Sequence, residues 1–398
     1  MPKSYRLNIY YLYLIKLSKW LMLIMPIVAL FYNENGLDDF DIFLLQAIYS
    51  ISVALMEIPS GYMADIVGRK KTLVVGCLLG TVGFLVYSIS YDFYGFLLAE
   101  VVLGIGGSFI SGADSAMLFD SLAATRRQHR YLQFEGRITS LGNFAETAAA
   151  VCGGLIASLL CYRAVYLSQA MVAALAIPAA LLLLEPPKDP FIVRPGLPHI
   201  LSICKNAILT DKKLSSTIFI SSITGIATLC MAWSSQIFFV ENGFTEVTIT
   251  PLWVSLNLTV ALFAAYASAA INFLGKKTSL LLIIIYIPSA YILLGWLPLI
   301  PALICLFVFY GVRGFATPVL KDLINQNCDS STRATVLSIR SLIIRFGFAL
   351  LGPSIGLLSD RFTLSFALIL AGAMLLILAI FAGSRLIYYM PGLLLPKS

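Results

Sequence analysis

Long apolar segments recur along this chain and limit the folds open to it. Each of twelve segments contains about twenty mostly apolar residues, enough for an α-helix to cross roughly 30 Å of hydrocarbon. Only 12% of the 398 residues are charged, whereas soluble proteins carry about 25%. We therefore expect an all-α protein embedded in a lipid bilayer. The twelve expected spans are 9–31, 42–63, 72–91, 96–118, 139–160, 164–184, 215–240, 247–274, 279–297, 301–323, 334–358 and 364–382.

Lysine and arginine are distributed unevenly among the loops that join these spans. Loops such as 69–71, 126–130 and 276–277 collect the cations, whereas the opposite loops are mainly acidic. Because cation-rich loops stay in the cytoplasm, both termini are predicted to be cytoplasmic. The formal net charge of +7 then reflects membrane topology, and no nucleic-acid partner is expected. No short apolar leader with a cleavage site is visible, so we expect the N-terminus to be retained.

The segment 185–214 differs from the sequence on either side of it. It contains five prolines and five cationic residues, a composition typical of a connection outside the membrane. We interpret it as a cytoplasmic linker with a surface helix near 198–209. The linker would separate an N-terminal six-helix bundle, 1–184, from a C-terminal six-helix bundle, 215–398.

The two halves repeat each other. A shift of 207 residues places Gly68-Arg69 on Gly275-Lys276, so a glycine and a cation recur at the same place between spans. The repeat is unequal, because the carboxylates Asp65 and Asp120 both fall on asparagine in the second half. Repeated bundles of this kind are common in secondary transporters, with the solute site near the bilayer midplane.

The stretch 61–71 forms a tight, charged connection between the second and third spans. Asp65 and Arg69 are four residues apart, within reach of each other if the turn is helical. The pattern G-x-x-x-D-x-x-G-R-K-K resembles the signature loop of the major facilitator superfamily of secondary transporters. This resemblance implies twelve transmembrane helices in two pseudo-symmetric six-helix bundles, and a cytoplasmic gate completed by an acid near the end of the fourth helix. The gate residues it implies are Gly61, Asp65, Gly68, Arg69 and Asp120.

Ionisable side chains inside the expected spans are functional candidates, because a charge at membrane depth is costly. Three acids are candidates for proton coupling: Glu146, Asp114 and Glu57. Glu146 is the first choice, because no cation follows Arg137 within its own helix. For each acid, a structural ion pair is the equally weighted alternative.

Cations inside the expected spans are candidates for the wall of a substrate cavity. These are Lys19, Arg313, Arg345 and Arg340. Glu57 is one partner that Lys19 could take. The neighbouring Lys16 lies close enough to the cytoplasmic end for its ammonium group to reach water.

Two transport functions are consistent with these charges. The first is proton-coupled export of a drug or metabolite, because segments 57–61 and 111–114 resemble drug-efflux-like bacterial members of the superfamily. The G-P-x-x-G pattern of the family's antiporters is missing from the fifth span, although 352–356 carries it in the eleventh. The alternative is proton-driven uptake of an anionic nutrient or siderophore-like compound, which Arg313 and Arg345 favour.

The sequence indicates a transporter and not an enzyme. It has no G-x-x-x-x-G-K-[ST] loop for ATP, no nucleophile–base pattern and no metal site, and its seven cysteines show no paired spacing. We therefore expect no cofactor, with a small solute, protons and the lipid bilayer as the partners of a monomer. The resemblance places it in a bacterial inner (plasma) membrane.

Overall fold

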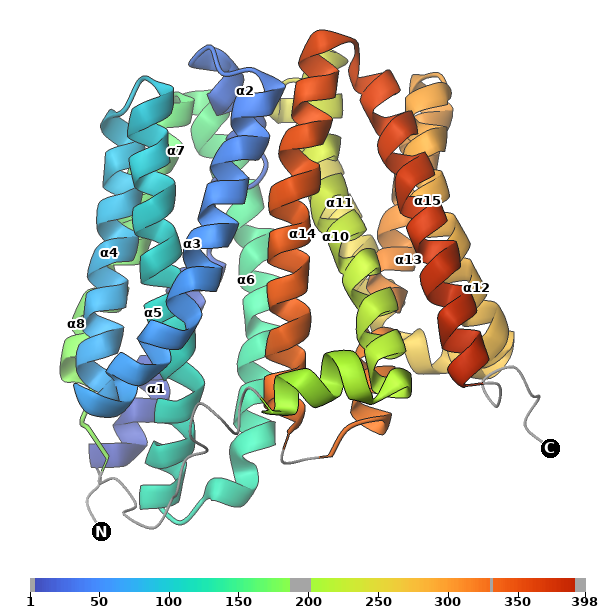
Figure 1. Ribbon diagram of the computed structural model, residues 1–398. Coiled ribbons are helices and arrows are strands. Elements are labelled where there is room, and N and C mark those ends of the chain that lie inside the picture. Colours follow the sequence, from blue (N-terminus) through green and yellow to red (C-terminus); the bar gives the residue numbers. More distant parts are fainter. Residues whose placement is uncertain (1–3, 187–201, 330–331, 391–398) are drawn as a thin grey trace. The chain divides into compact units, whose positions relative to one another are not determined.

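The computed structural model describes residues 4–186, 202–329 and 332–390. Within these ranges every regular element is a helix (Figure 1), as the sequence predicts. Ten of the helical segments described are long and apolar enough to cross a membrane. They are Asp39–Ile66, Arg69–Ile89, Phe93–Ala124, Tyr162–Leu182, Lys212–Glu241, Glu246–Ala265, Ala267–Trp296, Leu299–Gln326, Thr335–Arg361 and Leu364–Tyr389. The prediction of an all-helical, multi-pass membrane fold is confirmed.

The first expected span is not continuous, so the prediction of one helix over 9–31 is wrong. Helix α1 (Ser4–Trp20) ends well before α2 (Val28–Glu34) begins. The interrupted backbone, 21–27, includes Pro26, which cannot donate a helical hydrogen bond. Leu23 N–H instead donates to the buried Gln169 side chain at 2.7 Å. Such a break is tolerated inside a bilayer only where other parts of the protein satisfy the freed backbone groups.

The fifth expected span lies within a longer helix. Helix α6 (Tyr131–Leu159) follows the short 3-10 helix η1 (Gln128–Arg130) and begins eight residues before the span expected at 139–160. The eighth span, expected over 247–274, also differs, because α11 (Glu246–Ala265) ends earlier than the sequence suggests.

The signature loop turns sharply between α3 (Asp39–Ile66) and α4 (Arg69–Ile89). Gly68 has a φ of +110°, a backbone conformation that favours glycine. Asp65 and Arg69 therefore lie on different helices, and the turn between them is not helical. The connection is shorter than the expected stretch 61–71, because α3 continues through Gly61 to Ile66 and α4 begins at Arg69.

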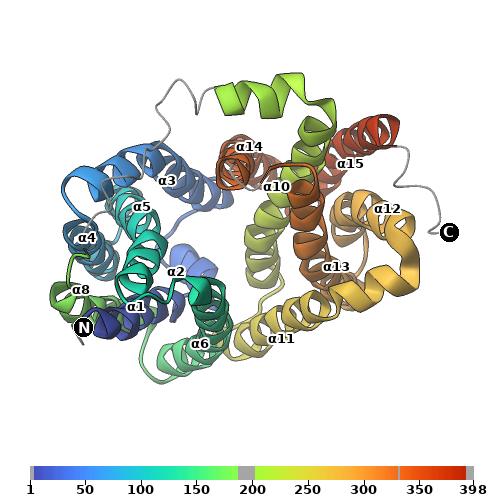
Figure 2. The same ribbon diagram turned by 90° about the horizontal axis from the view of Figure 1, so that it is seen from below.

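One compact unit comprises Met1–Ile192 and Gly243–Val254. In it α4 and α5 (Phe93–Ala124) lie side by side, with α3 along α5 and α7 (Tyr162–Ala174) along α4 (Figures 1 and 2). A core of buried apolar side chains joins α1, α4, α5 and α8 (Ala176–Leu182). It includes Leu12, Ile15, Leu73, Met117 and Ala180.

The other unit comprises Val193–Asn242 and Ser255–Ser398. Its long helices are α10 (Lys212–Glu241), α12 (Ala267–Trp296), α13 (Leu299–Gln326), α14 (Arg333–Arg361) and α15 (Leu364–Tyr389). Gly275 interrupts α12 with a φ of +78°, in the position that the repeat makes equivalent to Gly68. The α12–α13 connection is as short as the sequence suggests.

The division into 1–184, 185–214 and 215–398 stays a prediction. Residues 187–201, and with them part of the expected surface helix over 198–209, lie outside the described residues. The described part, 202–210, is helical and ends in η2 (Asn206–Thr210).

Candidate functional site

A buried group of charges joins three helices of the first unit. Lys16 on α1 is only 6% exposed, and its Nζ lies 2.7 Å from Glu135 Oε1 on α6 and 3.6 Å from Asp114 Oδ2 on α5. Ser115 Oγ lies 3.3 Å from both Lys16 Nζ and Glu135 Oε1. The expectation that Lys16 extends to water is therefore wrong. We call Lys16, Asp114 and Glu135 the acid–lysine cluster.

The acid–lysine cluster has an uneven charge count. Two carboxyl groups share one lysine, so with both acids ionised the three side chains carry one net negative charge. Lys16 is thus the cation that both carboxyl groups contact. Leu12, Ile15 and Met117 pack nearby in the apolar core. The geometry therefore lets Lys16 keep one carboxylate partner if its contact with the other is lost.

The structure also brings together two of the predicted gate residues. The Arg69 guanidinium forms an ion pair with Asp120 and donates a hydrogen bond to the backbone carbonyl of Ala116. Arg69 is nearly buried, which makes this contact more than an exposed surface pair. Asp65 lies one turn before the loop, at the end of α3, and Gly61 lies within α3. That the pair opens and closes a gate stays a prediction.

Sequence reasoning missed the acid that holds the start of α4. Both carboxylate oxygens of Glu185 accept hydrogen bonds at 2.8 Å, from Arg69 N–H and Lys70 N–H. These amides at a helix N-terminus lack partners within the helix and favour an anion. Asn8, which is fully buried, fixes the same segment by two hydrogen bonds to the backbone of Leu184.

Removing this carboxylate should loosen the signature loop. We expect Glu185→Ala to lower the stability by about 1 kcal/mol, as for the loss of other N-terminal caps. Glu185→Gln should retain part of the effect, because its amide oxygen can still accept one hydrogen bond. Thermal unfolding in detergent measures both variants. Equal unfolding midpoints for the wild type and Glu185→Ala would contradict this assignment.

Glu57, Glu146 and Lys19 lie outside the acid–lysine cluster and are less buried than Lys16. Glu57 on α3 and Glu146 on α6 are both partly buried, and Lys19 at the end of α1 is exposed. The acid–lysine cluster contains neither Glu57 nor Glu146. Of the three acids predicted for proton coupling, Asp114 is the one that belongs to the acid–lysine cluster.

The predicted cations of the second unit have polar or aromatic neighbours. Arg340 Nε donates to Ser221 Oγ at 2.5 Å, and the Arg313 guanidinium lies 5.3 Å from the centre of the Tyr310 ring. The buried Nε of Arg345 has no hydrogen-bond partner among the described residues.

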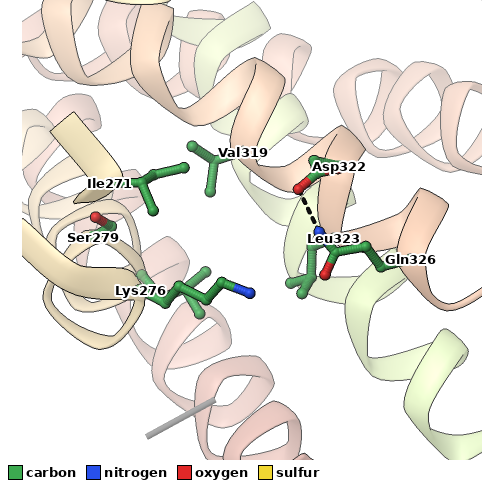
Figure 3. A pocket seen from close by; sticks show the side chains of 8 residues that line it. Ile271, Lys276, Ser279, Val319, Asp322, Leu323 and Gln326 are labelled. Atoms are coloured by element: carbon green, nitrogen blue, oxygen red, sulfur yellow. Dashed lines mark hydrogen bonds between the residues drawn. The ribbon is translucent and has the colours of Figure 1, made fainter. Parts of the chain in front are cut away.

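A small pocket lies at the second unit's copy of the signature loop. Figure 3 shows Lys276 extending beside Leu323 and Gln326, with Gln326 Nε2 donating to Asp322 at 2.6 Å. Its volume of about 40 Å³ would hold a few water molecules, whereas sites for drug-sized solutes measure about 300–1,000 Å³. This pocket is therefore not a candidate solute site.

The fold and the buried charges define a class of protein: multi-pass helical membrane proteins with ionisable groups inside their spans, an arrangement typical of transporters. The chain belongs to the Major Facilitator Superfamily, whose sequence description matches residues 18–351. The family that the sequence resembles is thus confirmed.

Curated relatives match only part of the chain. An uncharacterized MFS-type transporter of Methanocaldococcus jannaschii is 24% identical over 136 residues, 34% of each chain. The quinolone resistance protein NorA of Staphylococcus aureus is 22% identical over 98 residues, 25% of each chain. The chain thus spans about a third or less of the length of these relatives.

Solved structures match the fold over nearly the whole chain. The nucleoside transporter NupG has a TM-score of 0.75 at 13% identity and covers 96% of this chain and 99% of its own. A bacterial homologue of the human lysosomal transporter Spinster has a TM-score of 0.74 at 15% identity and covers 99% of this chain and 98% of its own. At such identities the similarity concerns the fold alone.

Proposed function

We propose that this transporter exports a small organic solute across a bacterial plasma membrane in exchange for protons. The acid–lysine cluster carries the proposal, because it places Lys16 and Asp114 beside the apolar core of one unit, with the half-buried Glu135 as a second carboxyl group. Buried ionisable groups in transporters commonly mark proton pathways. The cation-rich loops support an orientation with both termini in the cytoplasm.

The proton step can be followed through the residues of α5. With Asp114 and Glu135 both ionised, Lys16 contacts two carboxylates. A proton on either oxygen removes one negative charge and weakens one of those contacts. Asp120 follows Asp114 by six residues, about 9 Å along the same helix. A small shift of α5 would therefore also reach the Arg69–Asp120 pair, which links proton uptake to the proposed cytoplasmic gate.

The partial similarity to NorA supports export and suggests a first compound to test. A fluoroquinolone is a reasonable probe, because NorA is named as a quinolone resistance protein. Alternating access would expose the bound solute to one side of the membrane and then the other, without ATP. The solute, the protons and the lipid bilayer are then the partners of a protein that we propose to act as a monomer.

Neutralising the two carboxyl groups should separate proton coupling from solute movement. In proteoliposomes, we expect Asp114→Asn with Glu135→Gln to lower fluoroquinolone transport driven by a pH gradient by at least tenfold. Exchange of solute across the membrane without a gradient should remain, because that process needs no net proton transfer. Glu146→Gln, measured in parallel, tests the acid that the sequence favours most.

The outcome of these assays distinguishes the possible roles of the acids. Full gradient-driven transport in the Asp114/Glu135 variant would exclude the acid–lysine cluster as the coupling site. Loss in Glu146→Gln alone would assign coupling to Glu146. If protons and solute move in the same direction, the protein is an importer.

Uptake of an anionic solute is the second candidate function. It is favoured by the cations of the second unit, where Arg313, Arg340 and Arg345 form no ion pair within the described part of the chain. Buried arginines without carboxylate partners can bind carboxylate or phosphate groups through several N–H donors at once. Stabilisation of the purified protein against heat by organic anions, and not by fluoroquinolones, would favour this function over export.

A further inference from the structure

A second buried carboxyl group lies on α5, far from the acid–lysine cluster. Glu100 is 5% exposed and precedes Asp114 by 14 residues, about 21 Å along the helix. Neither the predicted gate nor the proposed proton step uses it. Because an acid inside a membrane span is costly and most often functional, its surroundings are informative.

Three hydrogen-bond donors converge on a single oxygen of Glu100. Its Oε1 accepts from Tyr87 on α4 at 2.6 Å, from Gln46 on α3 at 2.6 Å and from Tyr32 on α2 at 3.2 Å. The hydroxyl groups of Tyr32 and Tyr87 also lie 2.6 Å apart. We call Glu100, Tyr32, Tyr87 and Gln46 the Glu100 network.

Aromatic side chains enclose this network. Phe96 stacks on the Tyr87 ring at 5.4 Å, and Tyr166 on α7 stacks on it at 4.9 Å. Both rings are fully buried. They leave the carboxyl group in an apolar environment in which its polar partners are the only source of stabilisation.

No cation is among the hydrogen-bond or ion-pair partners of Glu100 in the described structure. The ionisable or polar groups facing it are Tyr32 from α2, Gln46 from α3, Tyr87 from α4 and Tyr166 from α7. The arginine at this end of the unit, Arg163, donates instead to Asn35 Oδ1 and to the carbonyls of Ser88 and Ser90. Its guanidinium also lies over the Tyr91 ring, 3.5 Å from the centre.

Two opposing effects act on the charge of Glu100. Burial without a cation penalises the carboxylate by several kcal/mol. Hydrogen bonds to a charged acceptor favour the same carboxylate by about 1.5–3 kcal/mol each. Because each tyrosine hydroxyl has one proton, either both donate to Glu100 or one donates to the other. The donors that favour the carboxylate are therefore the groups that a proton on Glu100 would have to displace.

Protonation would require the hydrogen bonds to rearrange. With a proton on Oε1, that oxygen could no longer accept from all three donors, and a hydroxyl group would have to turn away. Tyr32 has the longest of the three contacts. It lies on α2, which the break at 21–27 separates from α1. The contact that links α2 to Glu100 is thus the one that a proton on Oε1 would most readily displace.

We propose that Glu100 is a second proton-binding site of this transporter, and that its protonation releases Tyr32 and shifts α2 about the break at 21–27. The first unit would then bind a proton near each end of α5. This inference goes beyond the proposed function, because it requires neither export nor proton uptake at Asp114.

Infrared spectroscopy of the full chain in liposomes tests the proton site without a solute. On moving from alkaline to acidic buffer, the wild type should gain a carbonyl stretching band of a buried protonated carboxyl group, one that exchanges slowly with deuterium. Glu100→Gln should lose this band and keep the bands of exposed acids. Identical acid-minus-alkaline spectra in the two proteins would overturn the proposal.

A second variant addresses the network while leaving the acid in place. Tyr87→Phe removes one donor and keeps the ring, so the band should move to higher frequency because the carbonyl group has lost a hydrogen bond. Tyr94→Phe, at an exposed position on α5, is the matched control and should leave the band unchanged. A band that responds to neither Tyr87→Phe nor Glu100→Gln belongs to another acid and contradicts the assignment.

Hydrogen–deuterium exchange tests the movement of α2. After correction for the intrinsic effect of pH, acidic buffer should accelerate exchange in residues 28–34 of the wild type and not of Glu100→Gln. Equal acceleration in both would overturn the link between Glu100 and α2. Because no transport is measured, failure here is distinguishable from failure of the proposed export function.

Discussion

Replacing Lys16 with methionine should destabilise the protein by about 3–5 kcal/mol, the cost of leaving buried charges without their partner. Methionine keeps much of the apolar length of the lysine side chain but not its ammonium group. Asp114 and Glu135 would then face each other across an apolar core, their side chains only 11% and 30% exposed. Thermal unfolding in detergent should show a midpoint lower by on the order of 10 °C.

A cation on the same helix provides the control for this variant. Arg6 is exposed on α1, and Arg6→Met should change the stability by no more than about 0.5 kcal/mol. Adding Asp114→Asn and Glu135→Gln to Lys16→Met should restore much of the loss, since no unpaired charge remains. If Lys16→Met and Arg6→Met unfold at the same temperature, the acid–lysine cluster does not stabilise the first unit.

A single methyl group at Gly153 should disrupt the interrupted first span. The α6 backbone passes so close to the break that a Cβ atom at this position would overlap the carbonyl oxygen of Leu23. A backbone oxygen cannot move aside as the end of a flexible side chain can. We expect Gly153→Ala to cost about 3 kcal/mol or more, above the usual range for an overpacked core, and to lower the amount of folded protein.

Gly80 on α4 is the matched control for Gly153, because no atom lies within 4 Å of the position its Cβ would take. Gly80→Ala should stabilise the protein by about 0.5–1 kcal/mol, through the better helix propensity of alanine. Unfolding midpoints and the yield of monodisperse protein measure both variants. A Gly153→Ala protein as stable as Gly80→Ala would show that α6 does not hold the break at 21–27.

Much of the fold could be predicted from local sequence, because hydrocarbon imposes a length and an apolar composition on each span. The interruption of the first span after Trp20 could not be predicted in this way. The residues around Pro26 are as apolar as those in a continuous helix, and the partner that stabilises the broken backbone, Gln169, lies about 146 positions away. Periodicity within one segment contains no information about such a distant partner.

The candidate site was predictable only in part. Asp114 was recognisable as an acid inside a span, and Arg69 and Asp120 were implied by the family resemblance. Glu135 lies before the fifth expected span, where an acid has no special significance, so the sequence offered no reason to select it. Lys16 was interpreted as a lysine that reaches water, although its contacts with Asp114 and Glu135 keep it buried.

The sequence by itself determined that this protein is a multi-pass helical membrane protein of a known superfamily. It also determined that the loop between α3 and α4 is rich in cations and turns at a glycine. These properties depend on composition, span length and a local motif. Only the tertiary structure decided which charges meet. Lys16 pairs with two acids, Glu185 caps α4, and Glu100 is enclosed by tyrosines, because ion pairs and hydrogen bonds act over a few ångströms in space between residues far apart along the chain.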